Sequence, residues 1–270
     1  MTGFRHPHLS ESVMGSILSV KNVSLSFGGV KALDNVDIEF PSQKIIGIIG
    51  PNGAGKTTLL NVICGIAEPT EGQVFLDGVS LNDKKPNNIA ELGIRRTFQT
   101  SQLFPSMSVL ENMMAGLHLM SKSSLFGSIF RTHKMRSEEE EMRKRAMEAL
   151  DYVGFADFAD RPGNALSFGQ QRIIEIARTL IFDPKIVLLD EPAVGLSLSR
   201  VSELEVLLKK IRDERGVSLI MIEHVIRLVM GVSDSVIVLS SGKKIAEGSP
   251  DNVRENPEVI EAYLGHQKHA

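Results

Sequence analysis

Hydrophobic positions along this chain follow two spacings, which together predict a protein of the α/β class. Apolar and polar residues alternate through 17–27 and 36–40, as they do in half-buried, paired strands. Apolar runs at 45–49, at 186–189 and, interrupted by one serine, at 217–222 are instead typical of strands that are buried on both faces of a parallel sheet. The pattern therefore predicts a buried parallel sheet together with more exposed strands near the N-terminus.

Helical spacing replaces the strand patterns between Pro105 and Pro162. One apolar stripe runs along a single helix face: Met142, Ala146, Ala149, Leu150 and Val153. The opposite face carries acidic residues at 138–141 before basic residues at 143–145, which suits the helix dipole and fits either a solvated face or a docking surface. Further elements are predicted as helices behind residue 167, at 199–215 and at 257–264, and as a hairpin at 235–246.

The composition narrows the possible functions. The 270 residues suffice for one larger domain or two small ones, and the net charge of −3 gives no sign of a general nucleic-acid-binding protein. The single cysteine, Cys64, excludes an internal disulfide framework and is expected to be a core residue in a reducing compartment. No apolar run reaches the roughly 20 residues of a membrane span, so we expect a cytoplasmic protein that meets a membrane only through a partner. Residues 1–16 do not resemble a signal peptide and are expected to be a disordered extension, with Met14 as a candidate natural start.

The segment between the first buried strand and the next helix has the composition of a phosphate-binding loop. It matches the pattern G-x-x-x-x-G-K-[ST] and consists of Gly50, Pro51, Asn52, Gly53, Ala54, Gly55, Lys56, Thr57 and Thr58. The glycines let several backbone N–H groups point at one spot, where the helix N-terminus adds its positive dipole end. Lys56 would bind the β- and γ-phosphates of a nucleotide, and the Thr57 hydroxyl would bind Mg²⁺.

A second candidate site comprises Ser167, Phe168, Gly169 and Gln170. Ser167 and Gln170 have the spacing of a capping box, so Ser167 could serve only to cap the following helix. Alternatively, this helix end is a second phosphate site that uses the same physics as the first. Gly169, which capping does not require, would then leave the backbone open to a close approach.

Polar residues follow two of the buried strands directly. Asp190 and Glu191 come after one strand, and Glu223 and His224 come after another. Open α/β sheets bind ligands at the carboxyl ends of their strands, so Asp190, Glu191 and His224 are candidate site residues. Phe27, which precedes two glycines, is either a core residue or an aromatic that stacks on a nucleotide base.

These motifs, in this order, resemble an ATP-binding cassette (ABC) nucleotide-binding domain from Ile17 to Gly265. The matching parts are the Walker A loop at 50–57, the Q-loop glutamine Gln99, the ABC signature at 166–170, Walker B at 186–190, the acidic residue Glu191 and the switch histidine His224. Phe27 matches the A-loop aromatic, which favours base stacking. The resemblance implies a P-loop NTPase core with a mostly parallel sheet, an antiparallel β subdomain and a helical subdomain at about 100–165, followed by a tail at 266–270.

The finer pattern is similar to the LivG-type ATPases of branched-chain amino acid importers. The similar segments are 96–99, 103–112, 167–178 and 248–265. Phe168 at the third signature position is usual in that subfamily. Ser197 departs from the pattern, because most of the superfamily has Asp there and LivG-type proteins often have Asn. The serine is shorter and uncharged at a position that helps to tie two subunits together.

The resemblance implies a head-to-tail dimer with two ATP molecules in its interface, each held by 50–58 of one cassette and 167–170 of the other. Thr57, Asp190 and Gln99 would organise Mg²⁺, Glu191 would activate the attacking water, and His224 would hold the γ-phosphate. The implied partners are two transmembrane permease subunits, a second cassette (a LivF-like paralogue or a second copy) and, indirectly, a periplasmic substrate-binding protein. The chain would act at the cytoplasmic side of the inner membrane.

Other functions would use the same chemistry. The chain could serve another transport system, such as urea uptake, uptake of other amino acids or lipid export, or it could bind ATP and hydrolyse it weakly. A non-transport ABC protein that acts on ribosomes or DNA is disfavoured, because the chain has one cassette and no extended heptads.

Overall fold

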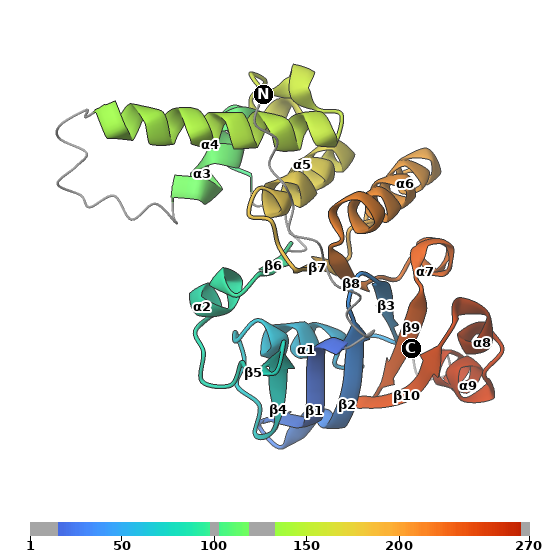
Figure 1. Cartoon of the computed structure of the whole chain (residues 1–270). Coiled ribbons are helices and arrows are strands. Elements are labelled where there is room, and N and C mark those ends of the chain that lie inside the picture. Colours follow the sequence, from blue (N-terminus) through green and yellow to red (C-terminus); the bar gives the residue numbers. More distant parts are fainter. Residues whose placement is uncertain (1–15, 98–102, 119–132, 266–270) are drawn as a thin grey trace.

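The computed structural model describes residues 16–97, 103–118 and 133–265 (Figure 1). Its strands are β1 (Ser16–Phe27), β2 (Val30–Pro41), β3 (Ile45–Ile49), β4 (Glu71–Leu76), β5 (Val79–Ser80), β6 (Ile94–Arg96), β7 (Ile186–Asp190), β8 (Ser218–Ile222), β9 (Ser235–Ser240) and β10 (Lys243–Gly248). They form a four-stranded antiparallel sheet with the order β2-β1-β4-β5 and a six-stranded sheet with the order β10-β9-β3-β8-β7-β6. In the larger sheet β10 runs antiparallel to β9, and the other neighbours are parallel.

The helices are α1 (Lys56–Ile63), α2 (Pro86–Glu91), α3 (Val109–His118), α4 (His133–Tyr152), α5 (Phe168–Leu180), α6 (Leu198–Arg215), α7 (Ile226–Val232), α8 (Pro250–Arg254) and α9 (Pro257–Gly265). Helices α3, α4 and α5 lie together at one end of the molecule, away from the antiparallel sheet (Figure 1). Within the described residues, no helix has the length and apolar character needed to cross a membrane.

The antiparallel sheet follows from alternation and turn chemistry. In β2 the buried residues Val36, Ile38 and Phe40 alternate with exposed ones, as the sequence predicts. Gly28 and Gly29 connect β1 to β2 with φ of 53° and 88°, a pair of positive angles that suits the twist of a two-residue hairpin.

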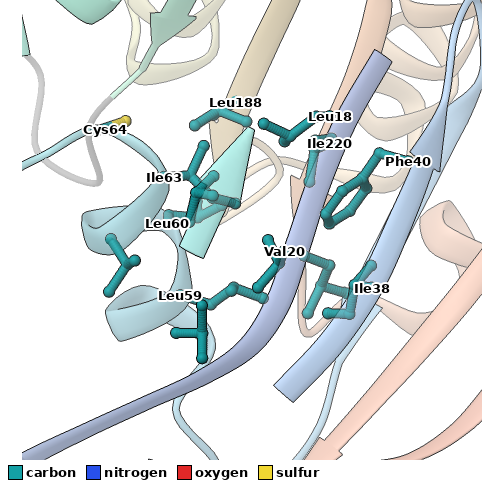
Figure 2. Close-up of a cluster of buried hydrophobic side chains, with 14 of the residues drawn as sticks. Leu18, Val20, Ile38, Phe40, Leu59, Leu60, Ile63, Cys64, Leu188 and Ile220 are labelled. Atoms are coloured by element: carbon teal, nitrogen blue, oxygen red, sulfur yellow. The ribbon is translucent and has the colours of Figure 1, made fainter. Parts of the chain in front are cut away.

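The larger sheet is a middle layer, which explains why its central strands are mostly apolar. Ile46 and Ile48 of β3 face a core shared with α1 and the antiparallel sheet, whereas Ile45 and Ile49 face the core on the other side. Strand β7 alternates in the same way. Figure 2 shows the first core, in which side chains of β1, β2 and α1 meet Leu188 of β7 and Ile220 of β8. Both faces are covered, so nearly all positions between the strand ends are apolar.

The helical region has a core of its own. Ala146, Ala149 and Leu150 of α4 are buried on the predicted face, together with side chains of α3 and α5. Residues of α5 also pack against the second core of the larger sheet. Helix α5 therefore links the helical region to the sheet.

The expected fold class is confirmed, with small differences in its elements. Strand β6 has only three residues, and Gln99 lies outside the described residues. The same holds for residues 1–15 of the extension expected at 1–16 and for the tail at 266–270, whereas Ser16 is the first residue of β1. Helices α2, α7 and α8 are short elements that the apolar periodicity does not predict.

Candidate active site

Three neighbouring strands bring the candidate residues to one edge of the larger sheet. Ile48 of β3 pairs with Ile222 of β8, and Ile222 pairs with Asp190 of β7. Just beyond these paired residues, β3 leads into the phosphate loop and β7 leads into Glu191. Strand β8 leads into the segment that carries His224. The parallel arrangement thus collects three polar segments at the carboxyl ends of the strands.

The phosphate loop depends on glycines whose backbone angles other residues rarely adopt. Gly50, Gly53 and Gly55 have φ of 151°, 77° and 96°. A methyl group on Gly50 would lie 2.0 Å from the Leu239 carbonyl oxygen, and one on Gly55 would lie 2.4 Å from the Ala32 carbonyl oxygen. The loop is therefore held tightly against β9 and β2. A methyl group added at Gly53 would have no neighbouring atom within 4 Å.

The loop leads directly into the N-terminus of α1, which has no side-chain cap. Its first N–H groups are thus left for an incoming acceptor such as a phosphate. The Lys56 ammonium instead donates to the carbonyl oxygens of Gly50 at 2.7 Å and Pro51 at 3.0 Å. Burial lowers the pKa of Lys56, whereas the nearby carboxylates of Glu191 and Asp190 act in the opposite direction. A cation that is partly desolvated beside free N–H groups is well suited to bind an anion.

Asp190 is almost fully buried, at 2% exposure, and is paired with a cation. Its Oδ2 accepts from the Arg96 guanidinium at 2.7 Å, and Arg96 also donates to Asn61 of α1 at 2.7 Å. The Asp190 Oδ1 atom is buried and has no hydrogen-bond partner. An orphaned carboxylate oxygen fits a cation ligand, because Mg²⁺ is usually held by one or two carboxylates plus substrate phosphates.

A Mg²⁺ ion bound at Asp190 would need oxygen atoms of the nucleotide to complete its coordination. Within the described residues, no three His, Cys, Asp or Glu side chains gather into a preformed metal site. Thr57 is exposed in the first turn of α1 and therefore free to take part. Gln99, the third expected ligand, lies outside the described residues.

Glu191 and His224 face one another across the ends of β7 and β8. The His224 Nε2 atom lies 3.0 Å from the Glu191 Oε1 atom. Glu191 has a φ of 50°, unusual for a residue with a side chain, and its N–H donates to the Ile222 carbonyl oxygen at 2.9 Å. Both side chains are partly exposed, so they remain open to substrate.

The second candidate site is built on a capping box at the start of α5, as the sequence predicts. The Ser167 hydroxyl accepts from the Gln170 N–H, and the Gln170 side chain accepts from the Ser167 N–H at 2.9 Å. Gly169 has a packing role, because a methyl group there would lie 3.1 Å from a methyl carbon of Leu196. A methyl group on Gly195 would likewise lie 3.3 Å from the Phe168 ring. These residues thus contact the turn that follows Glu191, and Phe168 keeps 42% exposure.

The remaining predicted residues lie at the surface. Phe27, at the end of β1, is 57% exposed and is therefore no core residue, which leaves its ring free to stack on a ligand. Ser197 precedes α6, and its hydroxyl lies 3.1 Å from the Ser199 hydroxyl.

Three further residues lie at the site, although no sequence motif assigns them a role there. Arg96 neutralises Asp190, and Glu223 accepts backbone N–H groups on both sides of the site. Burial raises the pKa of Tyr263 in α9, whereas a hydrogen bond with the backbone of Gly50 lowers it, so the last helix reaches the phosphate loop. Glu223 carried a detectable signal, because it directly precedes His224 after a buried strand. The other two depend on contacts between distant segments.

Two family models and a well-covered relative match this chain. Residues 33–194 match the family model described as ABC transporter, and residues 243–269 match the model of the branched-chain amino acid ATP-binding cassette transporter. The chain is 40% identical over 249 residues to the high-affinity branched-chain amino acid transport ATP-binding protein LivG of Escherichia coli (strain K12), covering 92% of this chain and 98% of that one.

Two solved structures are similar in fold. The crystal structure of the ADP conformation of an ATP-binding cassette of an ABC transporter has a TM-score of 0.82 and 35% identity, covering 93% of this chain and 99% of that chain. A dimeric post-hydrolysis cassette bound to ADP and Pi has a TM-score of 0.71 and 30% identity, covering 86% of this chain and 98% of that chain.

Proposed function

This chain belongs to the ATP-binding cassette family of ABC transporters, and on that premise we propose that it hydrolyses ATP to power the uptake of branched-chain or related amino acids through separate membrane permease subunits. The observation that carries the substrate class is the match of residues 243–269 to the branched-chain amino acid model. The similarity to LivG over 92% of the chain supports it. The convergence of Lys56, Asp190, Glu191 and His224 supports the reaction.

Nucleotide binding begins with an exchange of partners at Lys56. In the structure its ammonium donates to two carbonyl oxygens of its own loop. The β- and γ-phosphates of ATP offer charged oxygens, which form stronger hydrogen bonds with a cation than neutral carbonyls do. The N–H groups of the loop and of the first turn of α1 bind the same phosphates, and Phe27 stacks on the base.

Hydrolysis then uses the residues at the ends of β7 and β8. Glu191 orients and deprotonates the attacking water, a role that contributes typically 10²- to 10⁴-fold to the rate. His224 donates to the γ-phosphate. Thr57, Asp190 and Gln99 would hold a Mg²⁺ ion, which would neutralise negative charge on the phosphates.

A second cassette completes the site. One phosphate loop leaves the γ-phosphate half enclosed, and the capped end of α5 in another cassette supplies further N–H groups. The dimeric cassette with a TM-score of 0.71 supports this arrangement. The second cassette is a LivF-like paralogue or another copy of this chain. The permeases place the assembly at the cytoplasmic side of the membrane, and a periplasmic binding protein delivers the substrate.

The proposal is tested by uptake of radiolabelled leucine in cells from which the gene has been removed. We expect uptake to fall and to be restored by the wild-type chain but not by Glu191→Gln. Normal leucine uptake without the gene, accompanied by loss of urea uptake or of lipid export, would instead assign the chain to one of those systems.

Ser197 favours a second candidate, a cassette that binds ATP but hydrolyses it weakly. Its hydroxyl bonds only to Ser199 among the described residues, and a serine lacks the charge of the aspartate that the family resemblance implies at this position. Steady-state ATPase measurements on the assembled dimer separate the two. Turnover that rises at least tenfold in Ser197→Asp would support the weak cassette.

A further inference from the structure

Glu223 is a buried carboxylate whose partners are all backbone N–H groups among the described residues. It follows β8 and is 1% exposed. Its Oε1 accepts from Ala193 N at 2.5 Å, and its Oε2 accepts from His224 N at 2.9 Å and from Val225 N at 3.0 Å. Burying a charge without a cation is costly, and charge-assisted hydrogen bonds offset part of that cost. A buried carboxyl group that accepts from three backbone N–H groups indicates a specific role.

The three N–H groups belong to two different segments. Ala193 lies two residues after Glu191, in the turn that continues to Ser197. His224 and Val225 lie between β8 and α7. A single side chain therefore binds together the backbones that carry Glu191 and His224, whose own side chains meet at 3.0 Å. The Glu191 backbone is further fixed by its bond to the Ile222 carbonyl oxygen, which holds it in the strained left-handed conformation.

The same turn also touches the second candidate site. Gly195 approaches the Phe168 ring, and Leu196 packs against Gly169 so closely that a methyl group there would lie at 3.1 Å. Within the turn, Leu196 N donates to the Ala193 carbonyl oxygen at 3.1 Å, which makes the segment compact. A displacement at the start of α5 would therefore be carried through the turn to Ala193 and on to Glu223.

We propose that Glu223 is a positioning residue that couples turn 193–197 to His224, so that contact made by a second cassette at that turn sets the geometry of the Glu191–His224 pair. The proposal rests on the proposed function, because it assigns a role within the same hydrolytic site. It adds a route by which the turn and the histidine move together.

The test uses Glu223→Gln in the full chain. Glutamine keeps the size and one carbonyl oxygen, but its NH₂ group would face backbone N–H groups, so at least one bond is lost. We expect kcat to fall 10- to 100-fold with the KM for ATP within about twofold of wild type. Glu205→Gln on α6, a partly exposed residue paired with Lys209, is the matched control and should leave both values unchanged.

A double-mutant cycle separates positioning from general damage. If Glu223 acts through His224, adding Glu223→Gln to His224→Ala causes no further loss of kcat. Equal additional loss in that background, or an unchanged kcat in Glu223→Gln alone, would overturn the proposal. Should Glu223→Gln fail to fold, Glu223→Asp keeps the charge but is too short to span both segments, and the same cycle applies.

Hydrogen exchange gives a readout that does not need turnover. We expect the amides of Ala193, His224 and Val225 to exchange faster in Glu223→Gln, while amides in β3 stay protected. Unchanged protection at those three amides would contradict the proposal even if the chain proved not to hydrolyse ATP. Absence of ATPase activity in the wild-type assembly with the predicted exchange pattern would instead count against the proposed function alone.

Discussion

The Nε2 atom of His224 lies 3.0 Å from the Oε1 atom of Glu191, so the two side chains form a hydrogen bond across the ends of β8 and β7. In the proposed mechanism, this bond occupies groups that hydrolysis needs for other partners. Glu191 must turn to a water molecule, and His224 must turn to the γ-phosphate. On the proposed mechanism, substrate binding must therefore break this hydrogen bond.

Removing the charge of Glu191 should stop hydrolysis without preventing binding. We expect Glu191→Gln to retain ATP affinity, to lower kcat by about 10²-fold or more and to accumulate a nucleotide-bound dimer. Size-exclusion chromatography with ATP and a phosphate-release assay check both outcomes. Glu139→Gln on the exposed face of α4 is the control, and wild-type turnover in Glu191→Gln would remove this residue from the role of base.

Two glycines of the phosphate loop should respond differently to the same added methyl group. In Gly50→Ala the new carbon would lie 2.0 Å from the Leu239 carbonyl oxygen, so the loop or β9 must move. In Gly53→Ala the new carbon has no neighbour within 4 Å, and only the positive φ is unfavourable, by roughly 1–2 kcal/mol. We expect a large loss of nucleotide affinity and a lower Tm for the first and small changes for the second. Similar effects in both would show that packing against β9 does not matter.

Adding bulk at the start of α5 tests the contribution of a second cassette. We expect Ser167→Arg to abolish hydrolysis by the dimer while the nucleotide affinity of the isolated chain stays similar. Loss of the cap itself costs about 1 kcal/mol, so a control must lose a cap elsewhere. Ser249 caps α8 in the same way, and Ser249→Arg should lower stability by a similar amount and leave hydrolysis intact. Equal loss of activity in both variants would favour a purely structural cap.

The buried ion pair of Asp190 should matter far more for stability than an exposed one. Arg96 and Asp190 expose 7% and 2% of their side chains, whereas Lys185 and Asp77 expose 53% and 45%. Arg96→Gln leaves a buried carboxylate without its cation and should reduce the free energy of unfolding by about 3–5 kcal/mol. Lys185→Gln should cost at most about 1 kcal/mol. Chemical denaturation measures both, and comparable losses would contradict the role assigned to burial.

The only cysteine offers a measurement of pH dependence. Burial raises the pKa of the Cys64 thiol from 9.0 to about 11, so the thiolate is disfavoured in the folded state. Its contribution to stability is fully present below pH 9 and is lost as pH rises through about 11. At pH 8 we expect alkylation in the folded protein to be roughly 100-fold slower than in denaturant. Rapid labelling of the folded chain at pH 8 would show that the thiol is accessible.

The sequence was sufficient to predict the elements that one local pattern controls. The hairpin of β1 and β2, the doubly buried β7 and β8 and the capping box at Ser167 all follow from spacing within a few residues. The candidate residues of β7 and β8 could be placed together because parallel strands end at one edge. Their hydrogen bonds could not be predicted, since these depend on the rotation of neighbouring loops.

Side-chain partners that lie far apart in the sequence could not be predicted, because their contacts depend on which strands and helices become neighbours. Arg96 lies in a three-residue strand, and its pairing with Asp190 depends on β6 lying beside β7. The short helix α7 owes its position to packing by Leu228 and Val229 rather than to a cap, since its N-terminus has no side-chain cap. Gly169 was expected to leave space for a ligand, and the structure adds a tight contact with Leu196.

Tyr263 gives the molecule an optical property. The chain has two tyrosines and no tryptophan, so its ultraviolet emission comes from two known positions. Tyr263 touches the backbone of Gly50, whereas the Tyr152 ring lies 4.2 Å from the Lys210 ammonium and 4.3 Å from the Arg215 guanidinium. One fluorophore therefore reports on the loop that takes up phosphate, and the other reports on the contact between α4 and α6. Replacing either with phenylalanine would let each movement be followed in real time without an attached dye.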